Sequence, residues 1–267
     1  MNDDAAFTRM ISALQPWHRQ VVVVGGWAHR LHRLVPTAQP VDYQPLVTRD
    51  ADVAFGLHER LEGDIGAALR TSGFHEELSG EFVPPVSHFR FGGDDQGFYV
   101  EFLAPQLGGA QRRDGTPDAT VFRAGVSAQK LRHLNLLLCE PWTVTVPGEP
   151  AATIRIANPV TFIAQKLLIA EARPPHKRAQ DILYIHDTLD LFGGDLDALG
   201  TLWHETLRPT VPGRTASTVE ARAKAAFTQV SDDIRTAARI PPDRQLSPDR
   251  MQQALSQGLG IVFGTGR

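Results

Sequence analysis

Two aspartates stand one residue apart in the segment Arg49-Asp50-Ala51-Asp52-Val53-Ala54-Phe55. Because side chains alternate across a β-strand, Asp50 and Asp52 would share one face while the apolar residues between and after them occupy the other. Two carboxylates about 6.6 Å apart along a strand can bind two cations roughly 3.5 to 4 Å apart, the separation used for in-line phosphoryl chemistry. Such oxygen ligands suit Mg²⁺ or Mn²⁺ better than Zn²⁺. The pattern therefore predicts a metal site, although two hydrated aspartates on a solvent-facing edge strand would have the same spacing.

A third carboxylate, Glu101, lies between large apolar residues in the strand-like segment 98–103. An acid in so apolar a strand needs a partner. If this strand lies beside the strand of the two aspartates, Glu101 would join them and bind the metal ion that activates an incoming hydroxyl. The alternative is an exposed position on an edge strand.

Two adjacent glycines, Gly25 and Gly26, follow an apolar run at 21–24 and precede a segment with helical spacing of apolar residues at 27–34. Glycine exposes backbone N–H groups without an intervening side chain, and the following helix would direct its positive end toward phosphate oxygens. The segment is thus a candidate triphosphate cradle, or else an ordinary tight turn between a strand and a helix. His29 and Arg33, one helical turn apart, would either lean toward phosphate or lie on a solvated helix face.

The spacing of apolar residues along the chain predicts the helices and strands that must position these residues. We predict helices at 5–14, 27–34 and 59–69, strands at 21–24, 48–55, 82–86, 88–91, 98–103, 134–139 and 142–146, and a turn at 92–95. The segment 35–47 contains three prolines and few apolar residues, which indicates a mobile loop near the presumed site. Helical patterns follow at 159–172, 179–191, 196–207, 219–230 and 251–259. We therefore expect a mixed α/β domain over residues 1–157 and a helical domain over 158–267.

Composition excludes several classes of protein. The 267 residues are 42% hydrophobic with a formal net charge of −3, so the chain can bury a full core but has no overall positive field for nucleic acid. The single cysteine, Cys139, cannot form an intramolecular disulfide and is expected to be inert core. Without a signal-like start or an apolar run near 20 residues, we expect a cytoplasmic protein that does not cross a membrane.

Three segments together resemble the nucleotidyltransferase superfamily, whose fold is shared with DNA polymerase beta: Val24-Gly25-Gly26-Trp27-Ala28, Thr48-Arg49-Asp50-Ala51-Asp52-Val53 and Val100-Glu101-Phe102. The resemblance implies a mixed-sheet nucleotidyltransferase core in which Asp50, Asp52 and Glu101 hold Mg²⁺ or Mn²⁺. The substrate would be a nucleoside triphosphate (NTP), from which a nucleoside monophosphate passes to a hydroxyl. Many members place serine or threonine after the second glycine, whereas this sequence has Trp27, so a hydroxyl contact to phosphate is in question here.

The C-terminal part resembles the lysine and aspartate motifs of AbiEii-type toxins and related minimal nucleotidyltransferases, at residues 159–166 and 177–183. This resemblance implies that Lys166 contacts the nucleotide phosphates and that Asp181 orients a basic residue or the base. Together with Gly25 and Gly26 they would form the nucleotide-binding set. From the residues alone, Lys166 can equally be a snorkelling helix lysine, and Asp181 can pair with Lys177 four residues earlier.

The sequence leaves the acceptor open. A toxin-like enzyme acting on tRNA, with an antitoxin protein as a further partner, is favoured by a group of basic residues: Arg155, Lys166, Arg173, His176, Lys177 and Arg178. An antibiotic-modifying enzyme, for which acids near Asp94 and Asp95 could attract a cationic acceptor, and a protein-directed enzyme are the alternatives. A non-catalytic module that binds a partner protein would be a different class, but all three carboxylates are present, which argues against a degenerate site.

Overall fold

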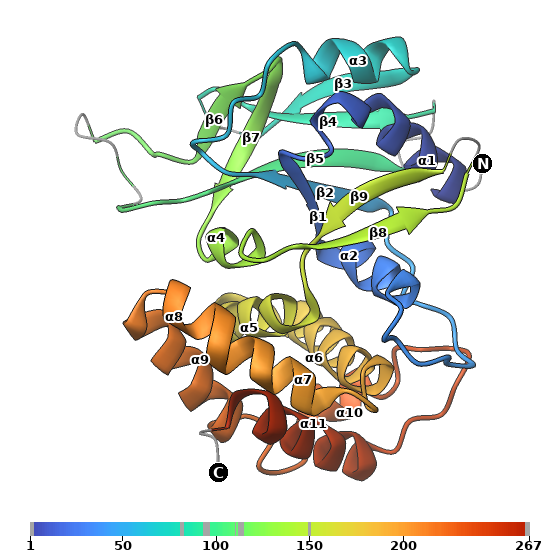
Figure 1. The fold of residues 1–267 in the computed structure, drawn as a ribbon, viewed down its shortest axis with the longest axis vertical. Coiled ribbons are helices and arrows are strands. Elements are labelled where there is room, and N and C mark those ends of the chain that lie inside the picture. The colour runs from blue at the N-terminus through green and yellow to red at the C-terminus, as the bar shows by residue number, and fades with distance from the viewer. Residues whose placement is uncertain are drawn as a thin grey trace. The chain divides into compact units, whose positions relative to one another are not determined.

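The computed structural model describes residues 3–80, 83–92, 97–109, 111, 115–148 and 151–264. The chain forms two compact units, which are described separately (Figure 1). The first comprises Met1–Leu31 and Val47–Ala157, and the second comprises His32–Leu46 and Asn158–Arg267. Phe82, residues 93–95 of the expected turn and the acids Asp94 and Asp95 lie outside the described residues. Within those residues no helix has the length and apolar character needed to cross a membrane.

A nine-stranded mixed sheet forms the first unit and confirms the predicted α/β class (Figure 1). Seven strands lie in the order β3-β4-β5-β2-β1-β9-β8, and β7, paired with β6, joins β5. The strands are β1 (Val21–Val24), β2 (Asp50–Phe55), β3 (Phe74–Ser79), β4 (Val86–Phe91), β5 (Tyr99–Pro105), β6 (Thr120–Arg123), β7 (Val126–Leu131), β8 (Trp142–Val146) and β9 (Ala152–Ile156). The strands β1, β2 and β5, which are rich in apolar residues, lie together near the middle of the sheet.

The helices of this unit are α1 (Asp3–Ala13), η1 (Gln15–Trp17), α2 (Gly25–Leu31), α3 (Ile65–Thr71) and α4 (Leu134–Leu137). Trp27 on α2 is buried and stacks on Phe7 of α1 with ring centroids 3.9 Å apart, while Phe98 meets both rings edge-on. The tryptophan that follows the glycines is therefore part of the core. This packing explains why a small hydroxyl residue does not occupy that position.

Several predicted boundaries in this unit are wrong. The helix expected at 59–69 begins only at Ile65, because the Asp64 carboxylate accepts a hydrogen bond from Ala67 N (2.7 Å) and caps the helix there. The strand expected at 134–139 is the short helix α4. Cys139 lies just after α4, half-buried rather than in the core, and burial raises the pKa of its thiol.

The second unit is helical, as predicted. Its elements are η2 (His32–Leu34), α5 (Pro159–Ile169), η3 (Ala170–Ala172), α6 (Pro175–Leu191), α7 (Leu196–Thr201), the π-helical η4 (Leu202–Leu207), α8 (Arg208–Thr210), α9 (Gly213–Ala225), α10 (Asp232–Ala237) and α11 (Pro248–Phe263). The Asn158 side chain caps α5 by accepting from Thr161 N at 2.9 Å. The helix expected at 219–230 is α9, which lies six residues earlier and ends at Ala225.

The segment between α2 and β2, which was expected to be a mobile loop, makes specific contacts with the rest of the helical unit. Tyr43 is buried; its hydroxyl donates to Asp190 Oδ2 (2.9 Å), and the Arg244 guanidinium lies 3.5 Å from the ring centroid. Gln39 N also donates to the carbonyl of Leu191 at 2.9 Å. Proline limits the conformations of this segment, and polar contacts to the end of α6 fix it on the helical unit.

Candidate active site

The acidic residues form a row across neighbouring strands of the sheet. In the parallel pair β2 and β5, Asp52 lies opposite Glu101 and Asp50 lies opposite Tyr99. Glu101 in turn lies opposite His88 in the antiparallel pair β4 and β5. The strand of Glu101 is therefore the direct neighbour of the strand that contains both aspartates, and we refer to Asp50, Asp52 and Glu101 as the carboxylate row.

Successive side chains of β2 point to opposite faces of the sheet, so its apolar residues and its two aspartates lie on different faces. Ala51, Val53 and Phe55 are fully buried, whereas Asp50 and Asp52 point to the other face and remain partly exposed. The same alternation leaves Glu101 partly exposed, with 22% of its side-chain surface accessible, beside buried neighbours on β5. Neither aspartate lies on an edge strand, because β2 is paired on both sides by β1 and β5.

The backbone at Gly25 lies in close contact with the side chain of Asp52 in the carboxylate row. It follows Val24, which is paired with Asp52, and it begins α2 with φ = 64°. A β-carbon at this position would overlap the carboxylate of Asp52. Glycine is therefore required both for the left-handed backbone and for the close approach of Asp52. Gly25 and Gly26 are the first residues of the helix rather than a separate turn before it.

Two members of the row, Glu101 and Asp50, contact polar neighbours. Glu101 Oε1 lies 3.1 Å from His88 Nε2, and His88 Nδ1 lies 3.1 Å from Ser79 Oγ on β3. Thr48 Oγ1 donates a hydrogen bond to Asp50 Oδ1. Sequence reasoning missed these residues, since a contact between three strands is not visible in local spacing. The available signal was the alternation in Ser87-His88-Phe89-Arg90, which places His88 on the polar face of its strand.

The electrostatic effect of the row is seen at Tyr99. The pKa of Tyr99 is raised to about 12, mainly by burial and then by the carboxylates of Asp50, Glu101 and Asp52 in that order of influence. All three carboxylates of the row therefore affect the pKa of the same tyrosine. Concentrated negative charge of this kind is stabilised by cations.

The donor chemistry of the row fits a hard divalent cation, because three carboxylates can supply oxygen ligands from one face of two adjacent strands. As the side chains lie, however, Asp50 accepts from Thr48 and Glu101 contacts His88. In the described part of the chain, no three His, Cys, Asp or Glu side chains already converge closely enough to hold a metal ion. The row thus has suitable ligands in adjacent positions without a completed coordination shell.

A sequence model of a nucleotidyltransferase family matches residues 2–208, which include the carboxylate row, α5 and α6. The chain belongs to the nucleotidyltransferase family. A search of curated proteins found no match to this sequence. Membership establishes the nucleotidyltransferase superfamily, and it implies an NTP as the substrate of this nucleotidyltransferase.

The helical unit of the nucleotidyltransferase places Lys166 and Asp181 in contact. Lys166 is only 6% exposed, and its Nζ lies 2.5 Å from Asp181 Oδ1 and above the rings of Phe162 and Tyr184, at 4.7 and 4.6 Å from their centroids. Arg173 Nε binds the other oxygen of Asp181 at 3.1 Å. Lys166 is therefore not a snorkelling surface lysine.

The suggested pairing of Asp181 with Lys177 is also wrong. Lys177 Nζ contacts Gln180 Oε1 at 3.5 Å, while the two oxygens of Asp181 bind Lys166 and Arg173. Partners fifteen residues apart on different helices are closer here than partners four residues apart on one helix. The carboxylate of Asp181 thus orients two basic residues.

The basic residues proposed to attract tRNA do not form one unpaired patch. Arg155 is on β9 in the first unit, where it donates to the carbonyl of Arg19. In the helical unit, Arg178 forms an ion pair with Asp233 at 2.9 Å, and Arg173 pairs with Asp181. His176 and Lys177 remain exposed at the start of α6.

His29 and Arg33 do not form the solvated helix face that was the alternative to a phosphate contact. His29 is buried, with 2% of its surface accessible. Arg33 lies beyond α2, in η2, where it donates to the carbonyl of Tyr43 at 2.8 Å and lies 5.1 Å from its ring centroid. Packing of η2 against the Tyr43 segment accounts for the difference.

Proposed function

We propose that this nucleotidyltransferase transfers a nucleoside monophosphate from an NTP to a hydroxyl acceptor, with Mg²⁺ or Mn²⁺ held by Asp50, Asp52 and Glu101. The observation that supports this proposal most strongly is the register of β2 and β5, which sets Asp52 directly beside Glu101. Family membership supports the reaction class. A non-catalytic module would have no need for three acids that share one face of adjacent strands.

In the proposed reaction, the acceptor oxygen forms a bond to the α-phosphorus while the bond from that phosphorus to the α–β bridging oxygen breaks. Pyrophosphate leaves, and the acceptor loses its hydroxyl proton to solvent or to a carboxylate of the row. When bound, the metal would stabilise charge on the phosphate oxygens and lower the pKa of the acceptor hydroxyl. His88 engages Oε1 of Glu101, which fixes the carboxylate and leaves its second oxygen for a ligand.

For the nucleotide, we propose Gly25, Gly26, Lys166 and Asp181 as the binding set. Gly25 and Gly26 supply backbone without side chains at the start of α2, and Gly25 lies against Asp52. Lys166 would contact a phosphate through its ammonium group, which Asp181 positions. Asp181 would act by holding Lys166 and Arg173 in place rather than by touching phosphate, because like charges repel.

The acceptor is proposed only as a hydroxyl compound. Pairing of Arg173 and Arg178 with carboxylates weakens the charge argument for tRNA and for an associated toxin–antitoxin role. Small-molecule and protein acceptors use the same carboxylate row, so the row does not distinguish them.

The proposal is tested by following two differently labelled forms of each NTP. With the label on the α-phosphate, we expect Mg²⁺-dependent incorporation into one of three fractions, namely RNA, protein or small molecules, whereas label on the γ-phosphate should leave as pyrophosphate. Incorporation of γ-label instead would indicate phosphoryl transfer and contradict the proposed reaction. The labelled fraction identifies the acceptor class.

A further inference from the structure

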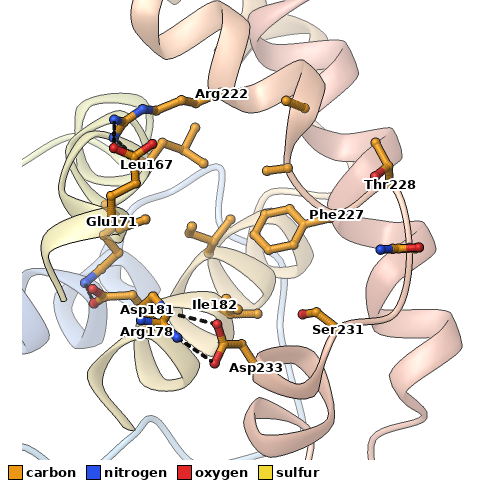
Figure 2. Close-up of a pocket in the computed structure, with 16 residues that line it drawn as sticks. Leu167, Glu171, Arg178, Asp181, Ile182, Arg222, Phe227, Thr228, Ser231 and Asp233 are labelled. Atoms are coloured by element: carbon orange, nitrogen blue, oxygen red, sulfur yellow. Dashed lines mark hydrogen bonds and ion pairs between the residues drawn. The ribbon is translucent and has the colours of Figure 1, made fainter. Parts of the chain in front are cut away.

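A cavity of about 370 Å³ lies entirely within the helical unit. Its walls come from α5, α6, the end of α9 and the segment that leads to α10 (Figure 2). The wall formed by residues 222–233 lies beyond the region 2–208 that the nucleotidyltransferase family model matches. Family membership therefore does not account for this part of the wall, whereas the part formed by α5 and α6 lies within the matched region. Its volume is in the range of small-molecule binding sites.

The charged groups on the wall neutralise one another. Each of the three cations is paired with a carboxylate that also lines the cavity: Lys166 with Asp181 at 2.5 Å, Arg222 with Glu171 at 2.7 Å, and Arg178 with Asp233 at 2.9 Å. An ionic ligand would have to break one of these pairs or be buried against apolar side chains without a counter-ion. The wall therefore favours an uncharged ligand.

The rest of the surface is aliphatic or aromatic. Leu167, Ile182 and Ile185 are buried side chains on the helical side of the cavity, and Phe227 lies opposite them, partly exposed. Figure 2 shows the Phe227 ring directed into the space in front of the helices that bear Leu167 and Ile182. An aromatic ring opposite branched aliphatic side chains makes a surface that a flat apolar molecule can contact on both faces.

The backbone at Phe227 supports a binding role for its ring. Its φ is 59°, in the left-handed region that disfavours residues with a β-carbon, and its carbonyl accepts a hydrogen bond from Gln252. Non-glycine residues keep such a conformation only where surrounding structure holds them, and they are concentrated at ligand sites. Here the strained residue directs a large aromatic side chain into a cavity instead of into the core.

We propose that this cavity binds an uncharged, planar aromatic small molecule, with its ring between Phe227 and the aliphatic wall formed by Leu167 and Ile182. The small side chains of Ala170, Ala225 and Ala226 leave the volume open. The site is formed by the helical unit alone, so binding does not require the carboxylate row. The cavity shares Lys166 and Asp181 with the proposed nucleotide-binding set, but binding of an uncharged molecule in it does not depend on the transfer reaction.

Two fluorescent probes that differ by one charged group test the proposal. N-phenylnaphthylamine is uncharged, and anilinonaphthalene sulfonate has the same rings with an added sulfonate. In fluorescence titrations of the whole protein, we expect saturable binding of one molecule of the uncharged probe, at least about tenfold tighter than the sulfonate, because the wall has no unmatched cation. Equal binding of both probes, or no saturation by the uncharged probe, would overturn the proposal.

Three variants locate the binding. Ala170→Trp fills the cavity and Phe227→Gly removes the ring while permitting the positive φ; each should weaken the uncharged probe at least about tenfold. Ala254→Trp, at an exposed position of α11, is the matched control and should bind as the wild type does. Thermal unfolding confirms that each variant is folded, and Ala170→Trp remains informative if Phe227→Gly unfolds. Wild-type affinity in both cavity variants would contradict the assignment.

Independence from catalysis is checked with Asp52→Asn, a substitution in the first unit. This variant should bind the uncharged probe with wild-type affinity whether or not it transfers nucleotide. A loss of probe binding in Asp52→Asn would show that the probe reports on the carboxylate row, and the proposed cavity site would then be wrong.

Discussion

Glu101 Oε1 lies 3.1 Å from His88 Nε2 across the antiparallel strands β4 and β5, and Ser79 contacts the other nitrogen of the same ring. Hydrogen bonds of this kind fix the direction of a metal-binding carboxylate, and their loss typically costs 10- to 100-fold in activity or metal affinity. His88 therefore acts as a positioning residue for the carboxylate row in the proposed reaction.

We expect His88→Ala to lower kcat by roughly 10- to 100-fold while KM for the NTP changes little, because the nucleotide contacts remain. His88→Gln retains an N–H donor and should recover part of kcat. Steady-state kinetics with both variants measures the effect, and near-ultraviolet circular dichroism checks the fold. Equal activity of His88→Ala and the wild type would remove the positioning role.

Gly25→Ala should impair both folding and activity. Its β-carbon would meet the Asp52 carboxylate, and the positive φ adds a backbone cost of roughly 1 kcal/mol or more. Gly260→Ala is the matched control, because Gly260 is exposed in α11 and a β-carbon there would have no neighbour within 4 Å. That control should stabilise the protein by about 0.5 to 1 kcal/mol.

Chemical denaturation and pyrophosphate release measure the two effects at these glycines. If Gly25→Ala retained full activity and stability, the close approach of Asp52 to the backbone would not be a requirement of the site.

The sequence predicted the strands that bear the carboxylate row better than the sheet around them. Apolar runs located β1 and β5, and the alternation of β2 placed Asp50 and Asp52 on one face. The strands β3, β6, β7 and β9 were missed. In β3, for example, three of the six residues are charged or histidine, so the hydrophobic period is weak. The segment 134–139 was wrongly assigned because a short leucine run has no period that separates helix from strand.

The sequence also did not predict contacts between residues that are far apart along the chain. The pairing of Glu101 with His88 depends on which strands become neighbours, and sequence spacing does not determine this. The partner of Asp181 was misjudged for the same reason, since Lys166 reaches it from another helix. The anchoring of Tyr43 by Arg244 joins residues about two hundred positions apart and is absent from any local pattern.

Lys166→Met should destabilise the helical unit by about 3 kcal/mol, because it leaves Asp181 buried with one cation fewer. The double variant Lys166→Met, Asp181→Leu removes both members of the pair and should recover part of this loss. Urea unfolding measures both. A double variant less stable than Lys166→Met would contradict this description of the pair.

At a temperature where Lys166→Met is folded, we also expect a higher KM for the NTP with a smaller change in kcat, since a phosphate contact is present before and during transfer. An unchanged KM would assign Lys166 to structure alone.

Charge reversal at Lys177 tests the RNA alternative more cleanly than reversal at Arg178, which would also break the ion pair with Asp233. Because Arg173 and Arg178 already pair with carboxylates, we expect Lys177→Glu to change label transfer to RNA by less than about threefold and to leave its salt dependence nearly unaltered. Transfer measured over a range of salt concentrations provides the comparison. A large loss with a shallower salt slope would instead support tRNA as the acceptor.

The most direct measurement for the proposed active site is Mg²⁺-dependent pyrophosphate release by the wild type and by Asp52→Asn. An amide cannot replace a carboxylate as a ligand against the negative charge of the triphosphate, so we expect a loss of at least about a thousandfold. Asp118→Asn, at a carboxylate that pairs with Lys130 away from the row, is the control and should retain activity. If folded Asp52→Asn released pyrophosphate within a few-fold of the wild-type rate, the carboxylate row would not be the catalytic metal site.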